Sequence, residues 1–147
     1  MAAALASRGW RVTVLDAAPA QAAGASGVPV GLLCPHVSRD DSPRSRLSRA
    51  GVRLTLQALR MMPERLHEGH EWAESGAMER WLDEALAPPA SHAQDIVALG
   101  GRPALWHAQA AWVKPSALIH AWLATPGVTW VGGQAVAAVR PFDGAWQ

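Results

Sequence analysis

Short apolar segments alternate with Gly- and Pro-rich loops from the first residues of the chain. Residues Ala2 to Ser7 favour a helix, and Gly9 stands where a helix end accommodates a left-handed residue. The apolar, β-branched run Val12 to Leu15 follows and ends at Asp16. This order predicts a helix that leads into a central parallel strand, because near-continuous apolar runs are typical of strands buried on both faces.

The next part of the chain predicts a loop followed by a long helix. Residues 17–31 are rich in Gly, Pro and small side chains, which disfavour regular structure. Ser42 and Pro43 suit a helix start, since proline needs no amide partner at the first helical position. We expect this helix over Arg44 to Met61. Its expected apolar face is loose and consists of Leu47, Leu54 and Leu59.

Weaker patterns occupy the middle of the chain. Pro63 should break the long helix, and Glu64 to Glu74 then favours a further helix carrying Leu66 and Trp72. Ser75-Gly76 predicts a turn. Strands are expected at residues 78–81, 96–99 and 104–106, with a break at Pro88-Pro89.

Helix and strand patterns return towards the end of the sequence. Lys114-Pro115-Ser116 introduces a helix that should run to about Leu123. Residues 128–131 and 135–139 are predicted strands on either side of Gly132-Gly133, a spacing that suits a hairpin turn or a sharp bend. We expect the N-terminal strand to lie beside one of these two strands in a parallel sheet.

Composition limits the class of protein and its compartment. The 147 residues are half hydrophobic, enough for one sizeable core, and their formal charge of +1 creates no global field for nucleic acid or an anionic membrane. No run reaches the roughly 18 to 20 apolar residues of a membrane span. Cys34 is the only cysteine, which fits a reducing compartment. We therefore expect a cytoplasmic protein that does not enter a membrane.

Two features carry candidate chemistry. The N-terminal helix, strand and acid have the order of the second half of a βαβ nucleotide-binding unit, in which the acid binds ribose hydroxyls. Asp16 is thus either a ribose ligand or a solvated carboxylate at a strand end. The loop Gly24-Ala25-Ser26-Gly27, followed by Gly31, has side chains small enough for main-chain donors to approach a phosphate or a flavin ring. Its alternative interpretation is a flexible surface loop.

Several motifs resemble the D-amino-acid-oxidase-like superfamily of FAD-dependent oxidoreductases. They are residues 8–14 (Arg-Gly-Trp-Arg-Val-Thr-Val), Ala18-Pro19-Ala20, the loop Gly24 to Gly27 with Gly31 and Pro35, and residues 111–118, which are similar to a Gly-Gly-Trp-x-x-Pro-x-x-Leu segment. More narrowly, the chain resembles the C-terminal oxidoreductase domain of the bifunctional tRNA 5-methylaminomethyl-2-thiouridine biosynthesis family.

The resemblance implies an α/β fold: part of an FAD-binding, Rossmann-like fold of the glutathione-reductase type, with part of an α+β substrate domain. Residues 1–62 and 113–147 would form the FAD-binding part, and residues 63–112 the partial substrate domain. The family's first Gly-rich turn would precede this chain, so we expect the 147 residues alone to bind FAD weakly or not at all.

The resemblance implies cofactor contacts for residues of this chain that match family motifs. Asp16 would hold the adenosine ribose, and the main chain of Val136 would contact adenine. The pyrophosphate and flavin would be lined by Gly24, Ala25, Ser26, Gly27 and Gly31. Val28-Pro29-Val30 departs from the polar residues usual in the family, so only main-chain contacts would remain there. No residue is assigned to catalysis.

The implied reaction is oxidative removal of the carboxymethyl group from carboxymethylaminomethyl-uridine at the tRNA wobble position, with FAD as hydride acceptor. The methyltransferase domain that acts next in the family is absent from this chain. Two alternatives stay open: a small-molecule amine or amino-acid oxidase of the same superfamily, and an inactive fragment.

Other clusters have simpler explanations. His67 and His70, among glutamates three or four residues apart, lack a compact metal-binding signature, so a solvated helix is preferred to a metal site. Cys34 beside His36 is taken as a structural thiol rather than a nucleophile. The arginines from Arg39 to Arg60 would suit tRNA phosphates, but a solvated helix face explains them as well.

Overall fold

The computed structural model describes residues 1–38, 40–80, 94–143 and 145–146. The chain forms two compact units, one made of Met1–Pro29 with Pro115–Gln147 and the other of Val30–Lys114. The second unit is therefore an insertion between two halves of the first. Because the units are defined by packing, the expected division at residues 62/63 and 112/113 into cofactor and substrate parts stays a prediction.

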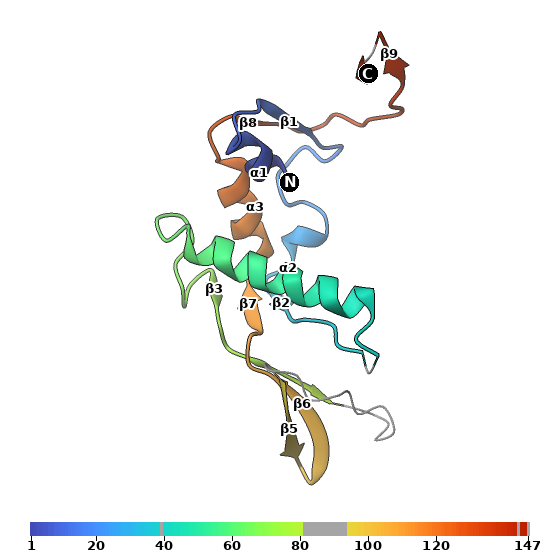
Figure 1. Ribbon diagram of the computed structural model, residues 1–147. Coiled ribbons are helices and arrows are strands. Elements are labelled where there is room, and N and C mark those ends of the chain that lie inside the picture. Colours follow the sequence, from blue (N-terminus) through green and yellow to red (C-terminus); the bar gives the residue numbers. More distant parts are fainter. Residues whose placement is uncertain (39, 81–93, 144, 147) are drawn as a thin grey trace. The chain divides into compact units, whose positions relative to one another are not determined.

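The first unit is built on one parallel strand pair (Figure 1). Helix α1 (Ala2–Ala6) leads through Gly9, whose φ is +87°, into β1 (Val12–Leu15). Strand β1 pairs in parallel with β8 (Val128–Val131), with Val12 opposite Val128 and Leu15 opposite Val131. Both strands and the parallel pairing are as predicted. The fold class is also confirmed, since the chain is mixed α/β with parallel and antiparallel sheets.

The predicted central position of β1 is wrong for the described residues. Within them, β8 is the only strand that pairs with β1. Val12 and Val14 are half-buried, but Thr13 and Leu15 on the opposite face are exposed. The alternation follows from the strand period of two, because only one face of this two-stranded sheet is covered.

Helix α3 (Pro115–Leu123) begins the second half of the first unit and leads into β8. It begins at the predicted proline. Its residues Leu118 and Ala121 are the buried apolar side chains among the described residues of the first unit. The prediction of a strand at residues 135–139 is wrong, and so is the hairpin at Gly132-Gly133. Residues 134–140 are exposed and have no regular structure, because no strand among the described residues pairs with them. The short strands β9 (Pro141–Phe142) and β10 (Ala145–Trp146) pair with each other.

Helix α2 (Pro43–Arg60) is the longest element of the second unit and matches its prediction within one residue at each end. The side chain of its N-cap, Ser42, accepts a hydrogen bond from the Ser45 amide, 3.3 Å away. The expected apolar face is wrong in two of its three members, since Leu47 and Leu54 are exposed. The face that packs on the unit consists of Ser45, Val52, Leu56 and Leu59. Steps of seven, four and three residues keep these side chains on one stripe, whereas residues 47 and 54 lie on the opposite side of the helix.

The second helix expected over Glu64 to Glu74 is wrong. The chain there forms turns and ends in β3 (Trp72–Ala73). Gly69 has a φ of +86°, and its amide donates to the carbonyl of Trp72 at 2.7 Å, a geometry that a helix cannot contain. Leu66 and Trp72 are nevertheless buried, because the turns fold both side chains back against the unit.

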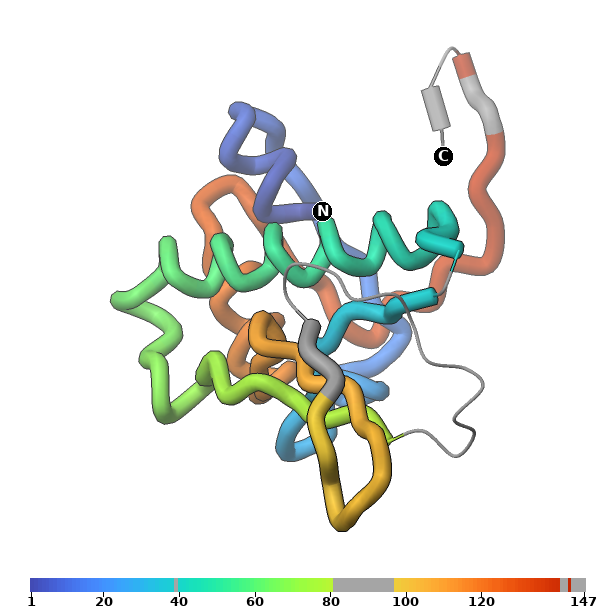
Figure 2. Tube along the Cα trace, turned by 60° about the horizontal axis from the view of Figure 1, so that its bottom comes forward, coloured from blue at the N-terminus to red at the C-terminus, as the bar shows by residue number. Residues whose placement is uncertain are grey.

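Two antiparallel sheets complete the second unit, with strand orders β2-β7-β3 and β4-β6-β5. Strand β2 (Gly31–Leu33) and β3 flank β7 (Ala111–Val113). The other sheet contains β4 (Ala77–Arg80), β5 (Gln94–Leu99) and β6 (Arg102–His107), of which β5 and β6 form a hairpin drawn in yellow to orange (Figure 2). These strands confirm the predictions at 78–81, 96–99 and 104–106 where residues are described. Trp81 and Pro88-Pro89 lie outside the described residues.

A bulge separates the two sheets along one continuous ribbon. Ala73 pairs with Trp112, but Ala77 pairs with His107, so one strand contains one residue more than its partner. The extra residue is taken up by a turn in which the Ala110 amide donates to the His107 carbonyl at 3.2 Å. Opposite it, Gly76 has a φ of +65°, and its amide donates to the Ala110 carbonyl at 3.0 Å. The turn predicted at Ser75-Gly76 is wrong, because the chain continues from β3 into β4 along the same antiparallel partner segment instead of reversing.

Gly76 also lies against the indole of Trp106. A Cβ atom at Gly76 would be 2.2 Å from Cζ2 of Trp106. Gly76→Ala should therefore lower the free energy of unfolding by about 2 to 4 kcal/mol, combining the left-handed backbone with displacement of the ring. Urea denaturation of the whole chain measures the loss.

Gly100→Ala is the matched control, because Gly100 has a φ of +59° but nothing within 4 Å of its Cβ position. It should cost only about 1 kcal/mol for the backbone conformation. Equal losses in the two variants would show that Trp106 does not require glycine at position 76.

Candidate functional site

Asp16 lies directly after β1, as predicted, and its environment is defined by main-chain contacts. Its Oδ1 accepts a hydrogen bond from the Ala18 amide at 2.9 Å. Its own carbonyl accepts from the Gln134 amide at 2.8 Å, and the Ala18 carbonyl accepts from the Gly133 amide at 2.9 Å. The segments that leave the carboxyl ends of β1 and β8 are thus joined to each other. This is the edge of a parallel sheet at which nucleotide ligands bind in open α/β folds.

Gly132 allows this junction to close. A Cβ atom at position 132 would lie 2.1 Å from the ring of Trp130 and 2.8 Å from the Ala18 carbonyl oxygen. Any side chain here would separate the two segments, so the Gly-Gly pair serves close approach rather than the hairpin expected from the sequence. The junction fixes where the Asp16 carboxylate lies.

The loop Gly24 to Gly27 forms a short 3₁₀ helix, η1 (Ala25–Gly27), in the first unit. The Gly27 amide donates to the Gly24 carbonyl at 2.9 Å, and a Cβ atom on Gly27 would lie 2.8 Å from the Ala22 carbonyl. Gly24 has open space around its Cβ position. Within the described residues, no hydrogen bond reaches the amides of Ala25 and Ser26. These two amides are available donors, and the Gly27 amide is not.

The two other predicted cofactor residues lie in different settings. Val136 is 56% exposed, two residues beyond the Gln134 contact, and its main chain forms no hydrogen bond within the described part of the chain. Gly31 belongs to β2 of the second unit and pairs with Val113, so it is a strand residue rather than the end of a loop. A cofactor role for each of these residues stays a prediction.

The chemistry of the first-unit residues fits FAD. A carboxylate at a strand end suits ribose hydroxyls, and free amides beside a glycine without neighbours suit a pyrophosphate. An exposed main chain after β8 leaves donors and acceptors for a purine edge. The set provides main-chain recognition with one charged side chain.

A second cluster, which the sequence did not reveal, is centred on His107 in the second unit. The imidazole is fully buried, and its Nε2 lies 2.9 Å from Oε2 of Glu79 on β4. Residues 79 and 107 are far apart in the sequence and become neighbours only through the register of β4 with β6. No local motif in the sequence indicates this pair, because it depends on the register of the two strands.

Cys34 lies in the same unit. Burial raises the pKa of its thiol, and the negative charge of Glu79 raises it further. A raised pKa keeps the sulfur protonated at neutral pH, and the thiolate is the nucleophilic form. This environment supports the interpretation of Cys34 as a structural thiol.

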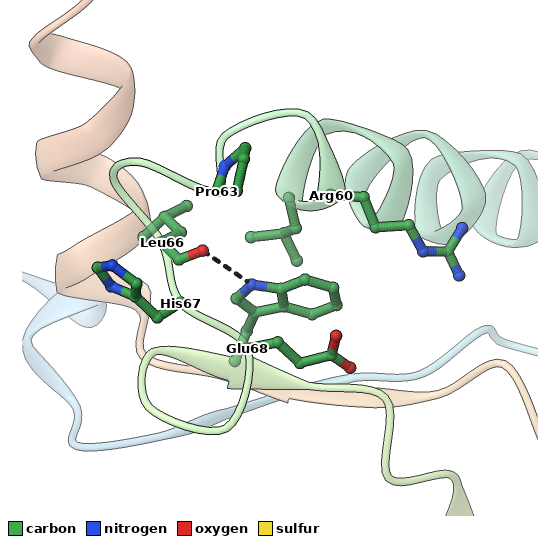
Figure 3. Close-up of a pocket in the computed structure, with 7 residues that line it drawn as sticks. Arg60, Pro63, Leu66, His67 and Glu68 are labelled. Atoms are coloured by element: carbon green, nitrogen blue, oxygen red, sulfur yellow. Dashed lines mark hydrogen bonds between the residues drawn. The ribbon is translucent and has the colours of Figure 1, made fainter.

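A pocket of about 380 Å³ lies beside the carboxyl end of α2 (Figure 3). Its apolar floor is buried and its rim is polar, with Arg60 and His67 extending in opposite directions. The lining residues are Leu59, Arg60, Pro63, Leu66, His67, Glu68 and Trp72. The indole Nε1 of Trp72 donates to the Leu66 carbonyl at 3.4 Å. Because the rim charges diverge, the pocket provides no convergent set of groups for a ligand.

The described residues provide neither a metal site nor a membrane-spanning helix. Among them, no group of three His, Cys, Asp or Glu side chains could hold a metal ion. The described helices include none that is both long and apolar enough to cross a membrane. Arg39 lies outside the described residues, and Arg49 forms an ion pair with Asp41.

Comparison with known proteins identifies the family. A family model described as "FAD dependent oxidoreductase" matches residues 1–147. The chain therefore belongs to the FAD-dependent oxidoreductase family, as the motifs in residues 8–35 and 111–118 predicted.

Curated relatives carry a more particular name. A protein of Albidiferax ferrireducens, "tRNA 5-methylaminomethyl-2-thiouridine biosynthesis bifunctional protein MnmC", is 50% identical over 147 residues, which is all of this chain and 21% of the relative. Proteins of the same name from Polaromonas naphthalenivorans and Pseudomonas aeruginosa are 44% and 38% identical and are covered over 26% and 24% of their length. The chain thus spans about a quarter or less of these relatives.

The turn that contains His67 and Glu71 allows a test of how a local hydrogen bond shifts a carboxyl pKa. A hydrogen bond from the His67 amide, 2.9 Å from Oε2 of Glu71, lowers the pKa of that carboxyl, and the His67 ring and the charge of Lys114 act in the same direction. Its contribution to stability is therefore fully present above the ordinary pKa of 4.5 and is lost as the pH falls through the lower folded value.

Glu71→Gln should accordingly lower the melting temperature at about pH 6, and the difference should shrink as the pH falls through the lowered folded pKa of Glu71, because the wild-type carboxyl then becomes neutral as well. Thermal melts followed by circular dichroism measure the difference at each pH. Glu64→Gln, an exposed carboxylate in the same turn region, is the control and should show no such closing gap. A Glu71→Gln effect that did not shrink at all as the pH was lowered would contradict the assignment.

Proposed function

We propose that this chain forms part of the FAD-binding portion of an oxidoreductase that acts on a C–N bond of the modified wobble uridine in tRNA. The observation that carries the proposal is 50% identity over the whole chain to a relative named for tRNA 5-methylaminomethyl-2-thiouridine biosynthesis. The Asp16 junction supports it, because it provides a ribose-binding carboxylate at the edge of a parallel sheet.

The residues of the chain would divide the binding of FAD among three elements. Asp16 holds the adenosine ribose, the amides of Ala25 and Ser26 donate to the pyrophosphate, and the main chain of Val136 contacts adenine. FAD, when bound, supplies the hydride acceptor for oxidation of the carboxymethyl-bearing amine. The role of this chain is therefore to bind and orient the cofactor.

One observation favours a different substrate or an inactive chain. Val28 and Val30, at positions where polar residues are usual in the family, are 47% and 55% exposed. An exposed valine contributes no hydrogen bond to a flavin ring. A small amine or amino acid as substrate, or loss of activity, is therefore an outcome that the functional test has to include.

The test uses a chimera between this chain and one of its relatives. In the Albidiferax ferrireducens protein, the matching segment is replaced by this chain, and the chimera is purified with FAD. We expect it to retain flavin, and Asp16→Ala to lower the affinity for FAD about tenfold or more, because the ribose loses a charge-assisted hydrogen-bond acceptor. Flavin absorbance per protein and fluorescence titration measure both.

Asp143→Asn is the control, since this exposed carboxylate lies in the same unit but outside the proposed site. Turnover is then followed with tRNA carrying carboxymethylaminomethyl-uridine and, separately, with glycine and sarcosine. Activity on the tRNA alone supports the proposal, and activity on the small amines alone overturns the substrate. A chimera that folds but retains no flavin overturns the cofactor role.

A further inference from the structure

Helix α2 has a second apolar stripe opposite the face that packs on its own unit. Leu47, Leu54 and Met61 at the C-cap are 73%, 65% and 74% exposed. They recur every seven residues, and seven residues complete about two turns of an α-helix, so the three side chains lie in one row. Val52 and Leu56 are buried on the far side. A helix that is apolar on two opposite faces is built to contact protein on both.

A row of arginines runs beside this stripe with the same period. Arg46, Arg53 and Arg60 each precede one member of the apolar row by one residue. Arg60 forms an ion pair with Glu74. Within the described part of the chain, Arg46 and Arg53 form no ion pair, and both are exposed. The stripe thus has a positively charged border, and no described residue of its own unit pairs with Arg46 or Arg53.

The other border of the stripe is formed by small residues. Gly51 lies in the middle of α2, and nothing in the described structure lies within 4 Å of its Cβ position. Glycine weakens a helix interior relative to alanine, and the packing of this chain does not require it here. Ala58 follows seven residues later on the same border. Small side chains at this spacing allow the main chain of a second helix to approach closely.

We propose that this face of α2 is a docking surface for an acidic amphipathic helix that lies outside this chain. Its apolar residues cover Leu47, Leu54 and Met61, its carboxylates pair with Arg46 and Arg53, and its main chain lies over Gly51. A second copy of α2 fits less well, because antiparallel pairing would bring the two arginine rows together. A nucleic acid would use the arginines but would leave the apolar row uncovered.

The binding test uses the 147-residue chain and two labelled helical peptides. Both peptides have leucines at the core positions of a heptad repeat, with glutamate at the flanking positions in one and lysine in the other. By fluorescence anisotropy, we expect the glutamate peptide to bind at least about tenfold more tightly, with affinity that falls as salt rises. Equal binding of the two peptides, or no binding of the glutamate peptide, overturns the proposal.

Three variants separate the parts of the surface. Arg46→Glu with Arg53→Glu should reverse the preference between the peptides. Leu47→Gln, Leu54→Gln and Met61→Gln together should reduce binding about tenfold or more, because the apolar contact is lost. Gly51→Phe should have a similar effect by blocking close approach. Since all these positions are exposed, circular dichroism should show unchanged folding.

One control variant tests the location of the surface, and two measurements test its rival occupants. Arg11→Glu with Arg102→Glu reverses the same number of exposed charges outside α2 and should leave peptide binding unchanged; reduced binding in this variant overturns the assignment to α2. Binding of bulk tRNA that depends on Arg46 and Arg53, in a chain that fails to bind the glutamate peptide, identifies a nucleic-acid surface instead. Sedimentation showing a dimer that the three glutamine substitutions dissociate identifies a second copy of the chain.

Discussion

The parallel pairing of Val12–Leu15 with Val128–Val131 is the contact on which the first unit depends. It joins strands from opposite ends of the sequence, and it brings the segment after Asp16 against the segment after Gly132. The entropy of closing a long loop grows only slowly with its length, so the whole second unit can be inserted between these strands at modest cost. The insertion begins with β2 and ends with β7, and their pairing closes its two ends. Without the β1–β8 pairing, Asp16 would have no fixed surroundings.

The two units are stabilised in different ways. In the second unit, buried apolar side chains come from α2, β6 and β7 and include Leu66 and Trp72. Among the described residues of the first unit, Leu118 and Ala121 are the apolar side chains that are buried. Asp16 and the loop Gly24 to Gly27 are fixed instead by main-chain hydrogen bonds and by glycines that permit close approach. A ligand that binds only the folded state would add directly to the stability of such a unit.

Local patterns in the sequence predicted elements whose residues carry their own signals. Ser42 and Pro43 mark the start of α2, and the run Val12–Leu15 marks a strand wherever its partner lies. The sequence failed where the decisive neighbour is distant. Residues 64–74 have helical composition, yet β3 forms because Trp72 pairs with Val113. Residues 135–139 have strand composition, yet the described part of the chain gives them no partner. The sequence pattern locates α2 within one residue at each end but does not show which of its faces is buried. Leu47 and Leu54 lie on the opposite side of the helix from the buried Leu59.

The proposed recognition of the cofactor through the main chain would explain how the family resemblance and the local departures can coexist. Among the proposed cofactor residues, Asp16 is the only one with a titratable side chain, and Gly24, Ala25 and Val136 would act through amides and carbonyls. A main-chain donor persists when its side chain changes, provided that the backbone keeps its path. Val28-Pro29-Val30 removes polar side chains without altering the free amides of Ala25 and Ser26. The positions that cannot vary are the glycines at close approaches, and at Gly132 even a methyl group would collide with the Ala18 carbonyl. Selection for cofactor binding should therefore act most strongly on small residues and on the single carboxylate at the end of β1.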